Sequence, residues 1–189
     1  MEMEEIYGNL PQLQTERLLL RKITMQDAED MFAYASDEDV SRYVTWDTHR
    51  TIEDSKGFIH FIEQQYDNGA LAPWAIEDKE SGRMIGTVDF VLWKPQHQLA
   101  EIGYVLNKNY WGKGLMTEAA GELLRFGFVE MDLVRVQARC FAENIGSGRV
   151  MEKIGMAYEG TQRKAAKIKG VHWDLKTFAI LKEEYELQL

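Results

Sequence analysis

Residues Ala100–Ala120 have the sequence AEIGYVLNKNYWGKGLMTEAA, which predicts a strand, a glycine turn and a helix in succession. The first seven residues are mostly β-branched, aromatic or small, as is typical of a strand. Gly112 and Gly114 then interrupt the pattern. From Leu115 onward, apolar and small residues recur at helical spacing, so the helix is predicted to begin at the glycines and to end near Met131.

The start of this helix is a predicted anion site. The first amide N–H groups of a helix have no partner within it, and the helix dipole favours negative charge there. Glycine lets a bulky anion approach the backbone closely, and Lys113 and Thr117 add side-chain donors. The predicted ligand is a phosphate or pyrophosphate, with contacts from Trp111, Gly112, Lys113, Gly114, Leu115, Met116 and Thr117.

Two well-known phosphate-binding motifs do not match this loop. The Walker loop needs Ser or Thr after its Gly-Lys pair, whereas Gly114 follows Lys113. The dinucleotide fingerprint needs a third glycine where Thr117 stands. These mismatches, together with a predicted antiparallel strand order, disfavour a small kinase or another unrelated phosphate-binding enzyme.

The same loop resembles motif A of the GNAT N-acetyltransferases, which binds the pyrophosphate of acetyl-CoA. The resemblance rests on residues 110–114 (YWGKG) and 117–119 (TEA), in the variety found around the RimJ/RimL-type ribosomal-protein N-terminal alanine acetyltransferases. A second segment, Asn144–Met156, is similar to the N-x-x-S-x-x-x-x-x-K-x-G-F segment of that group, with Met156 replacing the aromatic residue. Asn109 departs from the Gln or Arg that many relatives carry three residues before the first glycine.

The resemblance implies acetyl-CoA as co-substrate and direct attack by a primary amine within a ternary complex, with no metal. It implies that Asn144 hydrogen-bonds the pantetheine arm, although its position also suits a helix N-cap. Ser147 is the expected neighbour of the thioester sulfur and a candidate acid for the departing thiolate. In this family the motif strand and its neighbour splay apart, so free backbone groups pair with pantetheine and donate to the developing oxyanion. The strand contacts expected are Tyr104, Val105 and Leu106.

Acetylation also needs a group that removes a proton from the ammonium form of the acceptor, and a carboxylate can do this, often through water. Glu101 on the motif strand is the first candidate, and Asp89 on the neighbouring strand is the second. Each is alternatively a solvated carboxylate on a strand face. Cys140 lies in a predicted buried strand without a cue for activation, so it is interpreted as a core thiol. The four histidines show no metal-ligand spacing.

The acceptor pocket is expected to involve Tyr43, Trp46 and Trp74. The RimJ/RimL resemblance favours a protein N-terminus as acceptor. A small amine (polyamine, amino acid or antibiotic) is the alternative, and a non-catalytic module that senses acyl-CoA is another. Either an exposed strand edge or the N-terminal arm could support a homodimer. The basic stretch Lys164–Gly170 is interpreted as a solvated hairpin tip.

The amino-acid composition limits the other classes of protein to which this chain could belong. The chain has 189 residues, of which 45% are hydrophobic and 28% charged, as in ordinary globular domains. A net charge of −9 argues against a nucleic-acid surface and an anionic membrane. A single cysteine excludes an internal disulfide and suits a reducing cytoplasm. The N-terminus lacks a secretory pattern, and no apolar run approaches the ~20 residues of a membrane span.

Taken in order, the hydrophobic patterns predict a strand, two helices, three antiparallel strands, a helix, a strand, a helix and two strands. This is a mixed α/β domain with a mostly antiparallel sheet flanked by helices, and it is also the element order of the GNAT fold. We expect an N-terminal arm at residues 1–12, a single GNAT N-acetyltransferase domain at 13–182 and a C-terminal tail at 183–189.

Overall fold

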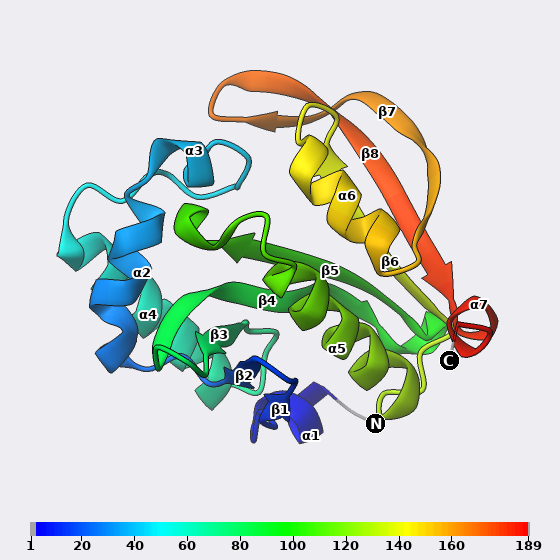
Figure 1. Cartoon of the computed structure of the whole chain (residues 1–189), viewed down its shortest axis with the longest axis horizontal. Helices are drawn as coiled ribbons and strands as arrows, with labels where there is room; N and C mark the ends of the chain where they lie inside the picture. The colour runs from blue at the N-terminus through cyan, green and yellow to red at the C-terminus, as the bar shows by residue number, and fades with distance from the viewer. Residues whose placement is uncertain (1–2, 189) are drawn as a thin grey trace.

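A computed structural model describes residues 3–188, so residues 1, 2 and 189 of the expected arm and tail lie outside it. The centre is one eight-stranded sheet in the order β1-β2-β3-β4-β5-β6-β8-β7 (Figure 1). The strands are β1 Leu13–Gln14, β2 Leu18–Arg21, β3 Trp74–Asp78, β4 Arg83–Lys94, β5 Leu99–Leu106, β6 Arg135–Phe141, β7 Ala157–Ile168 and β8 Val171–Leu181. Neighbouring strands are antiparallel except for β5 and β6. The mixed, mostly antiparallel class predicted from the sequence is therefore confirmed.

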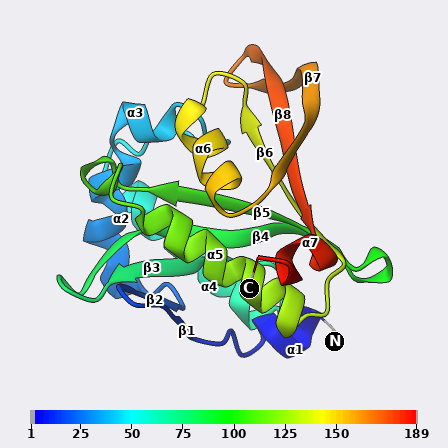
Figure 2. The same cartoon turned by 45° about the vertical axis from the view of Figure 1, so that its right-hand side comes forward.

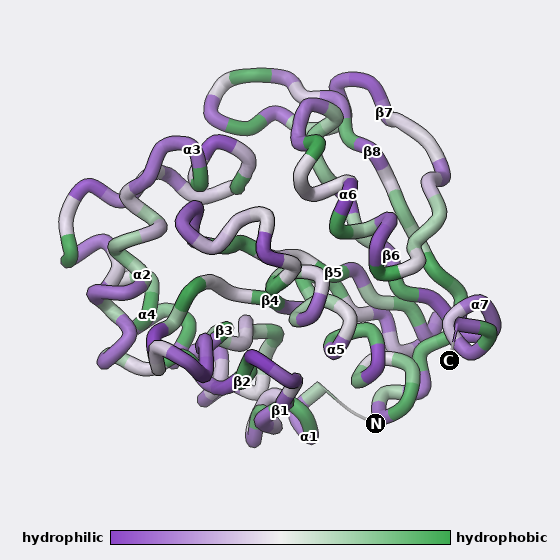
Figure 3. The backbone as a smooth tube through the Cα atoms, viewed as in Figure 1, coloured by the Kyte–Doolittle hydropathy of each residue, from purple (hydrophilic) through white to green (hydrophobic). Residues whose placement is uncertain are grey.

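Helices cover both faces of this sheet. Figure 2 shows α5 and α6 in front of the strands, with α2 and α4 behind them. The helices are α1 Met3–Tyr7, α2 Ala28–Ala35, α3 Glu38–Ser41, α4 Ile52–Asp67, α5 Leu115–Val129, α6 Ile145–Lys153 and α7 Lys182–Glu186. Apolar residues line the inner strands and the inward helix faces, as the hydropathy colours of Figure 3 show. None of these helices is long and apolar enough to cross a membrane.

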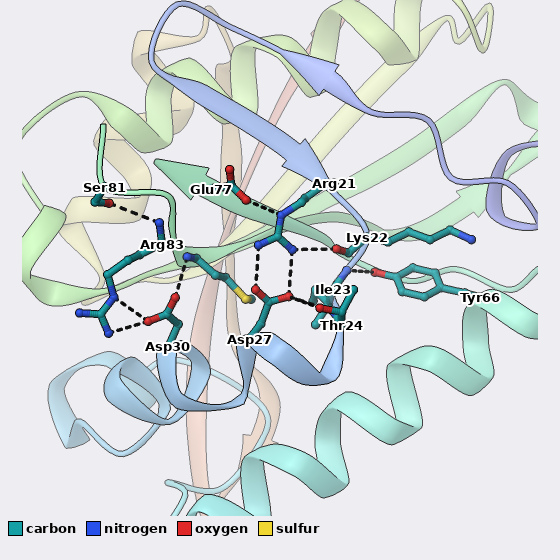
Figure 4. Close-up of polar contacts among 11 residues, drawn as sticks. Arg21, Lys22, Ile23, Thr24, Asp27, Asp30, Tyr66, Glu77, Ser81 and Arg83 are labelled. Atoms are coloured by element: carbon teal, nitrogen blue, oxygen red, sulfur yellow. Dashed lines mark hydrogen bonds and ion pairs between the residues drawn. The ribbon is translucent and has the colours of Figure 1, made fainter. Parts of the chain in front are cut away.

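The entry to α2 is held by a buried ion-pair network around Arg21 of β2 (Figure 4). Its guanidinium forms two hydrogen bonds with Asp27, at 2.7 and 2.9 Å, and one with Glu77 of β3. The same Asp27 carboxylate accepts a hydrogen bond from the backbone N–H of Thr24, which completes the capping turn before α2. A bidentate arginine pair is geometrically specific, so the network fixes where α2 crosses the sheet.

Trp74 belongs to the hydrophobic core, so its predicted role in an acceptor pocket is wrong. Its side chain is fully buried on the face of the sheet that α5 covers. Its ring centroid lies 6.3 Å from that of Phe90 and 6.0 Å from that of Phe126. The indole N–H donates to the carbonyl oxygen of Pro11 at 2.8 Å. The alternation of β3 turns this residue away from the opposite face, where a large cavity lies.

Both chain ends pack against the domain within the described residues. Ile6 and Tyr7 of α1 are buried, and the Tyr7 ring lies 5.8 Å from that of Trp74. Tyr185 of α7 packs against Phe128 at 5.0 Å. The described parts of the arm and tail are thus docked helices rather than extended chain.

The β7–β8 hairpin reaches over the sheet toward α3 (Figure 1). Lys169 at its tip donates to the carbonyl oxygen of Ser41 at 2.6 Å. Below this contact, the ring of Tyr43 lies 5.7 Å from Phe141 and 6.1 Å from Trp173. We define the strap as the Lys169–Ser41 hydrogen bond together with the packing of Tyr43 against Phe141 and Trp173. Lys164, Lys167 and Lys169 are exposed, as expected of a solvated tip, and Lys169 is in addition hydrogen-bonded to Ser41.

Close approach of β4 and β5 depends on Gly86. A Cβ at this position would lie 2.2 Å from the carbonyl oxygen of Val105, so Gly86→Ala must push the strands apart. We expect a loss of roughly 1–3 kcal/mol in the free energy of unfolding, measured by urea denaturation. Gly121→Ala on α5 is the control, because its Cβ would meet nothing within 4 Å. It should stabilise the helix by about 0.5–1 kcal/mol. Equal unfolding midpoints for the two variants would contradict the packing argument.

Candidate active site

A cavity of about 660 Å³ runs through the sheet between α4 and α6. Residues from α2, α4, β4, β5, β6, α6 and the hairpin line it, together with the segment between α2 and α4. Of the site residues predicted from sequence, the cavity lining includes Glu101, Tyr104, Val105, Asn144 and Ser147. The structure therefore brings together predicted residues that lie more than 40 positions apart in the chain.

The cavity exists because β5 and β6 separate along part of their length. They pair only from Leu99 with Arg135 to Ile102 with Ala138. Beyond that point β5 continues to pair with β4, and β6 continues to pair with β8. The edge of residues 103–106 that faces β6 consequently has no strand partner, which confirms the predicted splay of the central strands.

Successive residues of β5 reach opposite faces of the sheet and divide the cavity into two sides. Glu101 points to the face covered by α2 and α4, where it meets side chains of β6. Tyr104 points to the other face, where it meets Ser147 of α6. We call these the α4 side and the α6 side. A molecule lying in the splay is thus reached from both faces.

The α6 side carries a cluster of hydroxyl groups at the splay. The Ser147 hydroxyl donates to the Tyr104 hydroxyl at 3.1 Å, and Tyr104 donates in turn to the carbonyl oxygen of Ser147 at 3.0 Å. Burial raises the pKa of Tyr104, against the hydrogen bond from Ser147, so the phenol keeps its proton. The Asn144 side chain accepts from the Ser147 N–H at 3.2 Å and caps α6. Burial also raises the pKa of the Cys140 thiol, as expected of an inert core cysteine.

The two candidate bases differ sharply in their surroundings on the α4 side. Glu101 is 5% exposed and accepts 2.8 Å hydrogen bonds from Gln137 and from Arg139. Within residues 3–188, Asp89 has neither a hydrogen bond nor an ion pair, although it lines the same cavity. Burial raises the pKa of Asp89 to about 7. Glu101 is thus hydrogen-bonded through both oxygens, whereas Asp89 is unpaired and its raised pKa allows proton exchange near neutral pH.

Gly103 is the cross-strand partner of Asp89, and its lack of a side chain lets neighbouring side chains lie over it. A Cβ on Gly103 would lie 3.1 Å from Asp89 Oδ1 and 2.6 Å from a methyl group of Val91. The glycine therefore allows Asp89 and Val91 to pack closely against β5. The titratable neighbours of Asp89 are the phenols of Tyr7 and Tyr66, whose pKa values burial and the Asp89 charge both raise.

An aromatic wall completes the α4 side, defined by Trp46, His49, Phe58 and Phe61. Successive ring centroids lie 5.4, 6.0 and 6.4 Å apart along this series. His49 is bonded through Nδ1 to Ser55 at 2.8 Å, and burial lowers its pKa, so the ring is held neutral. Trp46 was expected in this pocket from sequence, whereas no pocket role was predicted for His49, Phe58 or Phe61. Phe58 and Phe61 lie one helical turn apart on α4, a spacing that core packing also produces.

The glycine loop lies outside the cavity, on the surface at the start of α5. Gly112 and Gly114 have φ angles of 75° and 77°, a conformation that favours glycine, and Gly114 is the N-cap of α5. Lys113 is exposed, with its ammonium 4.9 Å from the Tyr110 ring centroid. Of the predicted contacts, Leu106, Leu115 and Met116 have buried side chains and offer only backbone groups, whereas Trp111 is 47% exposed.

Arg17, which the sequence analysis did not single out, braces this loop from the start of β2. Its Nε donates to Glu118 on the first turn of α5 at 2.7 Å. Its Nη1 donates to the carbonyl oxygen of Lys113 at 3.0 Å. The carbonyl oxygen of Lys113 is thereby tied to the guanidinium of Arg17. Only the 101-residue separation between Arg17 and Glu118 hid this contact from sequence.

The fold and the site can now be compared with known proteins. Residues 17–157 match the family described as "Acetyltransferase (GNAT) domain". The chain belongs to the GNAT acetyltransferase family. It is 39% identical over 171 residues to the Bacillus subtilis protein named uncharacterized N-acetyltransferase YnaD, covering 90% of this chain and 97% of YnaD.

Solved GNAT structures agree with this assignment. A GNAT-family acetyltransferase from Bacillus anthracis is 36% identical, with a TM-score of 0.81 over 92% of this chain and 99% of that one. The microcin C7 self-immunity acetyltransferase MccE, solved with acetyl-CoA and AMP, is 23% identical with a TM-score of 0.78, covering 88% of this chain and 93% of that one. At that identity MccE shows the shared fold alone. Within residues 3–188, no cluster of three or more His, Cys, Asp or Glu side chains is arranged to hold a metal ion.

If Arg17 positions the glycine loop, Arg17→Ala should weaken CoA binding two- to five-fold, equivalent to about 0.5–1 kcal/mol for a half-exposed ion pair. Titration calorimetry with CoA measures the effect. Arg125→Ala is the matched control, because Arg125 pairs with Glu122 on the same helix but away from the loop. Equal losses in both variants would show that the helix, rather than the loop contact, is responsible.

Proposed function

We propose that this GNAT acetyltransferase transfers the acetyl group of acetyl-CoA to a primary amine by direct attack in a ternary complex. One observation carries the proposal. The splay opens the sheet between an unpaired carboxylate on one face and a hydroxyl cluster on the other. An acyl group in the splay therefore has a proton acceptor on one side and proton donors on the other, as the transfer requires.

The residues present fit acetyl-CoA. The left-handed glycines and the free N–H groups at the start of α5 suit a pyrophosphate, and Lys113 adds a positive charge. The unpaired edge of residues 103–106 suits the amides of pantetheine, which bind like an added strand. Asn144 lines the cavity beside Ser147, and its amide NH₂ lies outside the capping bond and can donate to the pantetheine arm. When bound, acetyl-CoA would supply the activated acyl group, as its presence in the MccE structure supports.

We propose Asp89 as the base and Glu101 as the residue that neutralises Arg139. A base must hold its lone pair free, and Asp89 has no competing donor within residues 3–188. A pKa near the operating pH also suits a general base. Glu101, the first choice from sequence, stays a rival prediction, although Gln137 and Arg139 already occupy its two carboxylate oxygens.

On the α6 side, Ser147 is the proposed proton donor to the departing sulfur. Its hydroxyl is held by Tyr104, and the Tyr104 phenol remains protonated because of its burial. For this donation the Ser147 O–H must turn from the Tyr104 oxygen toward the sulfur, and the phenol O–H can then turn from the Ser147 carbonyl to donate a hydrogen bond to the serine oxygen. Backbone N–H groups near Tyr104 and Val105 complete the site by donating to the acyl oxygen.

We propose that the reacting amine lies at the end of the acceptor molecule or chain. The strap crosses one side of the cavity through Lys169 and Tyr43, so a chain cannot lie across that side with an internal lysine inserted. A protein N-terminus satisfies this constraint, in keeping with the resemblance to the RimJ/RimL type. A small primary amine satisfies it equally, and a non-catalytic acyl-CoA-sensing module would need no such acceptor.

The decisive assay is release of free CoA thiol from acetyl-CoA in the presence of amines. We expect release with at least one free-amine acceptor and none with the same acceptor after N-acetylation. Peptides with free and blocked N-termini, small monoamines and polyamines form the panel. Binding of acetyl-CoA without release by any amine would favour the sensing module and contradict the proposed transfer.

The two candidate bases are separated by the pH dependence of kcat/KM. Asp89 must be ionised to accept a proton, so the rate should rise with pH and level off above about 7. Asp89→Asn should lower kcat by roughly 10²–10⁴-fold and abolish this rise of the rate with pH, the acidic limb of the profile. Glu101→Gln should retain the acidic limb and lower kcat by a smaller factor. A pH limb that disappears in Glu101→Gln but persists in Asp89→Asn would restore Glu101 as the base.

A further inference from the structure

The charge lining the cavity is nearly balanced. Only three of its lining residues carry formal charge when His49 is neutral: Asp89, Glu101 and Arg139. Arg139 pairs with Glu101 through a 2.8 Å hydrogen bond. One unpaired negative charge therefore remains, and it belongs to Asp89 on the α4 side. A cavity with one excess charge suits a ligand with one positive charge.

The rest of the α4 side is apolar and partly open. Phe61 is 53% exposed and Val91 is 50% exposed, although both line the cavity. Leu71 and Pro73 lie beside them, and the aromatic wall faces the same space. Exposed apolar side chains gathered around a concave site mark the place where a ligand's own apolar surface binds.

We propose that the acceptor is a primary amine with a single positive charge on an aromatic or bulky apolar body. Its ammonium binds at Asp89 and its body lies against Trp46, Phe58 and Phe61. This inference rests on the proposed function and names the substrate class of the same site. The chemistry has two sources: a free arylalkylamine, or a chain whose first residue is aromatic.

The same features argue against the other acceptors. The additional cations of a polyamine or an aminoglycoside would meet no second unpaired carboxylate among the lining residues. An N-terminal alanine or serine would leave the aromatic wall in contact with water, so the apolar area would contribute nothing to binding. The preferred first residue thus differs from the alanine of the enzymes that the glycine loop resembles.

The test compares kcat/KM for matched acceptors by CoA release: phenethylamine with ethylamine, phenylalaninamide with alaninamide, and a Phe-first peptide with an Ala-first peptide. Spermidine completes the set. We expect at least a ten-fold preference for the aromatic member of each pair that reacts. The aromatic acceptor with the highest kcat/KM shows whether the preferred substrate is a free arylalkylamine or a chain whose first residue is aromatic. A preference for spermidine or for the Ala-first peptide would overturn the inference while leaving the proposed function intact.

A variant tests whether Phe61 contributes to the preference for aromatic amines. Phe61→Ala should raise the KM for phenethylamine at least five-fold with little change in kcat, and should leave ethylamine unaffected. Because Phe61 is exposed, the variant should fold normally. Val129→Ala, which removes a 59% exposed side chain of α5 outside the cavity lining, is the control. Equal KM changes for both amines would overturn the assignment of the wall.

A binding readout separates the inference from the proposed transfer. Quenching of tryptophan fluorescence in the CoA-bound protein reports amine binding near Trp46 without turnover. Asp89→Asn should weaken binding of phenethylamine at least ten-fold while leaving the uncharged isostere 2-phenylethanol unchanged. Binding with this pattern but without CoA release would support the acceptor class and contradict the transferase proposal. Absence of phenethylamine binding would overturn the acceptor class.

Discussion

The parting of β5 and β6 beyond Ile102 and Ala138 is the constraint on which the rest of the site depends. Unpaired backbone groups inside a protein are costly unless something else bonds to them. Here each parting strand keeps its outer partner, β4 for β5 and β8 for β6, so only one edge of each lacks a strand partner. That edge is where a ligand rich in amides can replace the absent strand. A ligand that bonds to this edge would therefore offset the cost of the gap in the sheet.

The pleat of β5 turns this gap into a two-sided site. Neighbouring residues of a strand face opposite ways, so Gly103 lies against Asp89 on one face while Tyr104 reaches Ser147 on the other. In the proposed mechanism, proton removal at Asp89 and proton delivery from Ser147 are therefore separated by the thickness of one strand. No mobile element is needed to bring the two groups to the splay, because Asp89 on β4 and Ser147 on α6 already line the same cavity.

Local patterns in the sequence were enough to predict the fold class, the glycine loop, the start of α5 and the cap at Asn144. The family resemblance predicted the splay. What local pattern could not predict were contacts between distant segments. Arg139, 38 residues beyond Glu101, decides that this carboxylate is paired, and this pairing is why we propose Asp89 ahead of Glu101 as the base. Trp74 looked like a pocket aromatic, but the direction of its side chain depends on the face that α5 covers.

The isolation of Asp89 gives the site a way to respond to its acceptor. Burial raises the pKa of Asp89 to about 7, so near neutral pH the empty site holds this group partly protonated. An ammonium group bound at Asp89 from the cavity would favour the charged carboxylate and lower that pKa. Arrival of the acceptor would therefore ionise the proposed base. Glu101 differs from Asp89 because it already has Arg139 as its ion-pair partner. The difference between the two carboxylates lies in which one still lacks a partner when the acceptor arrives.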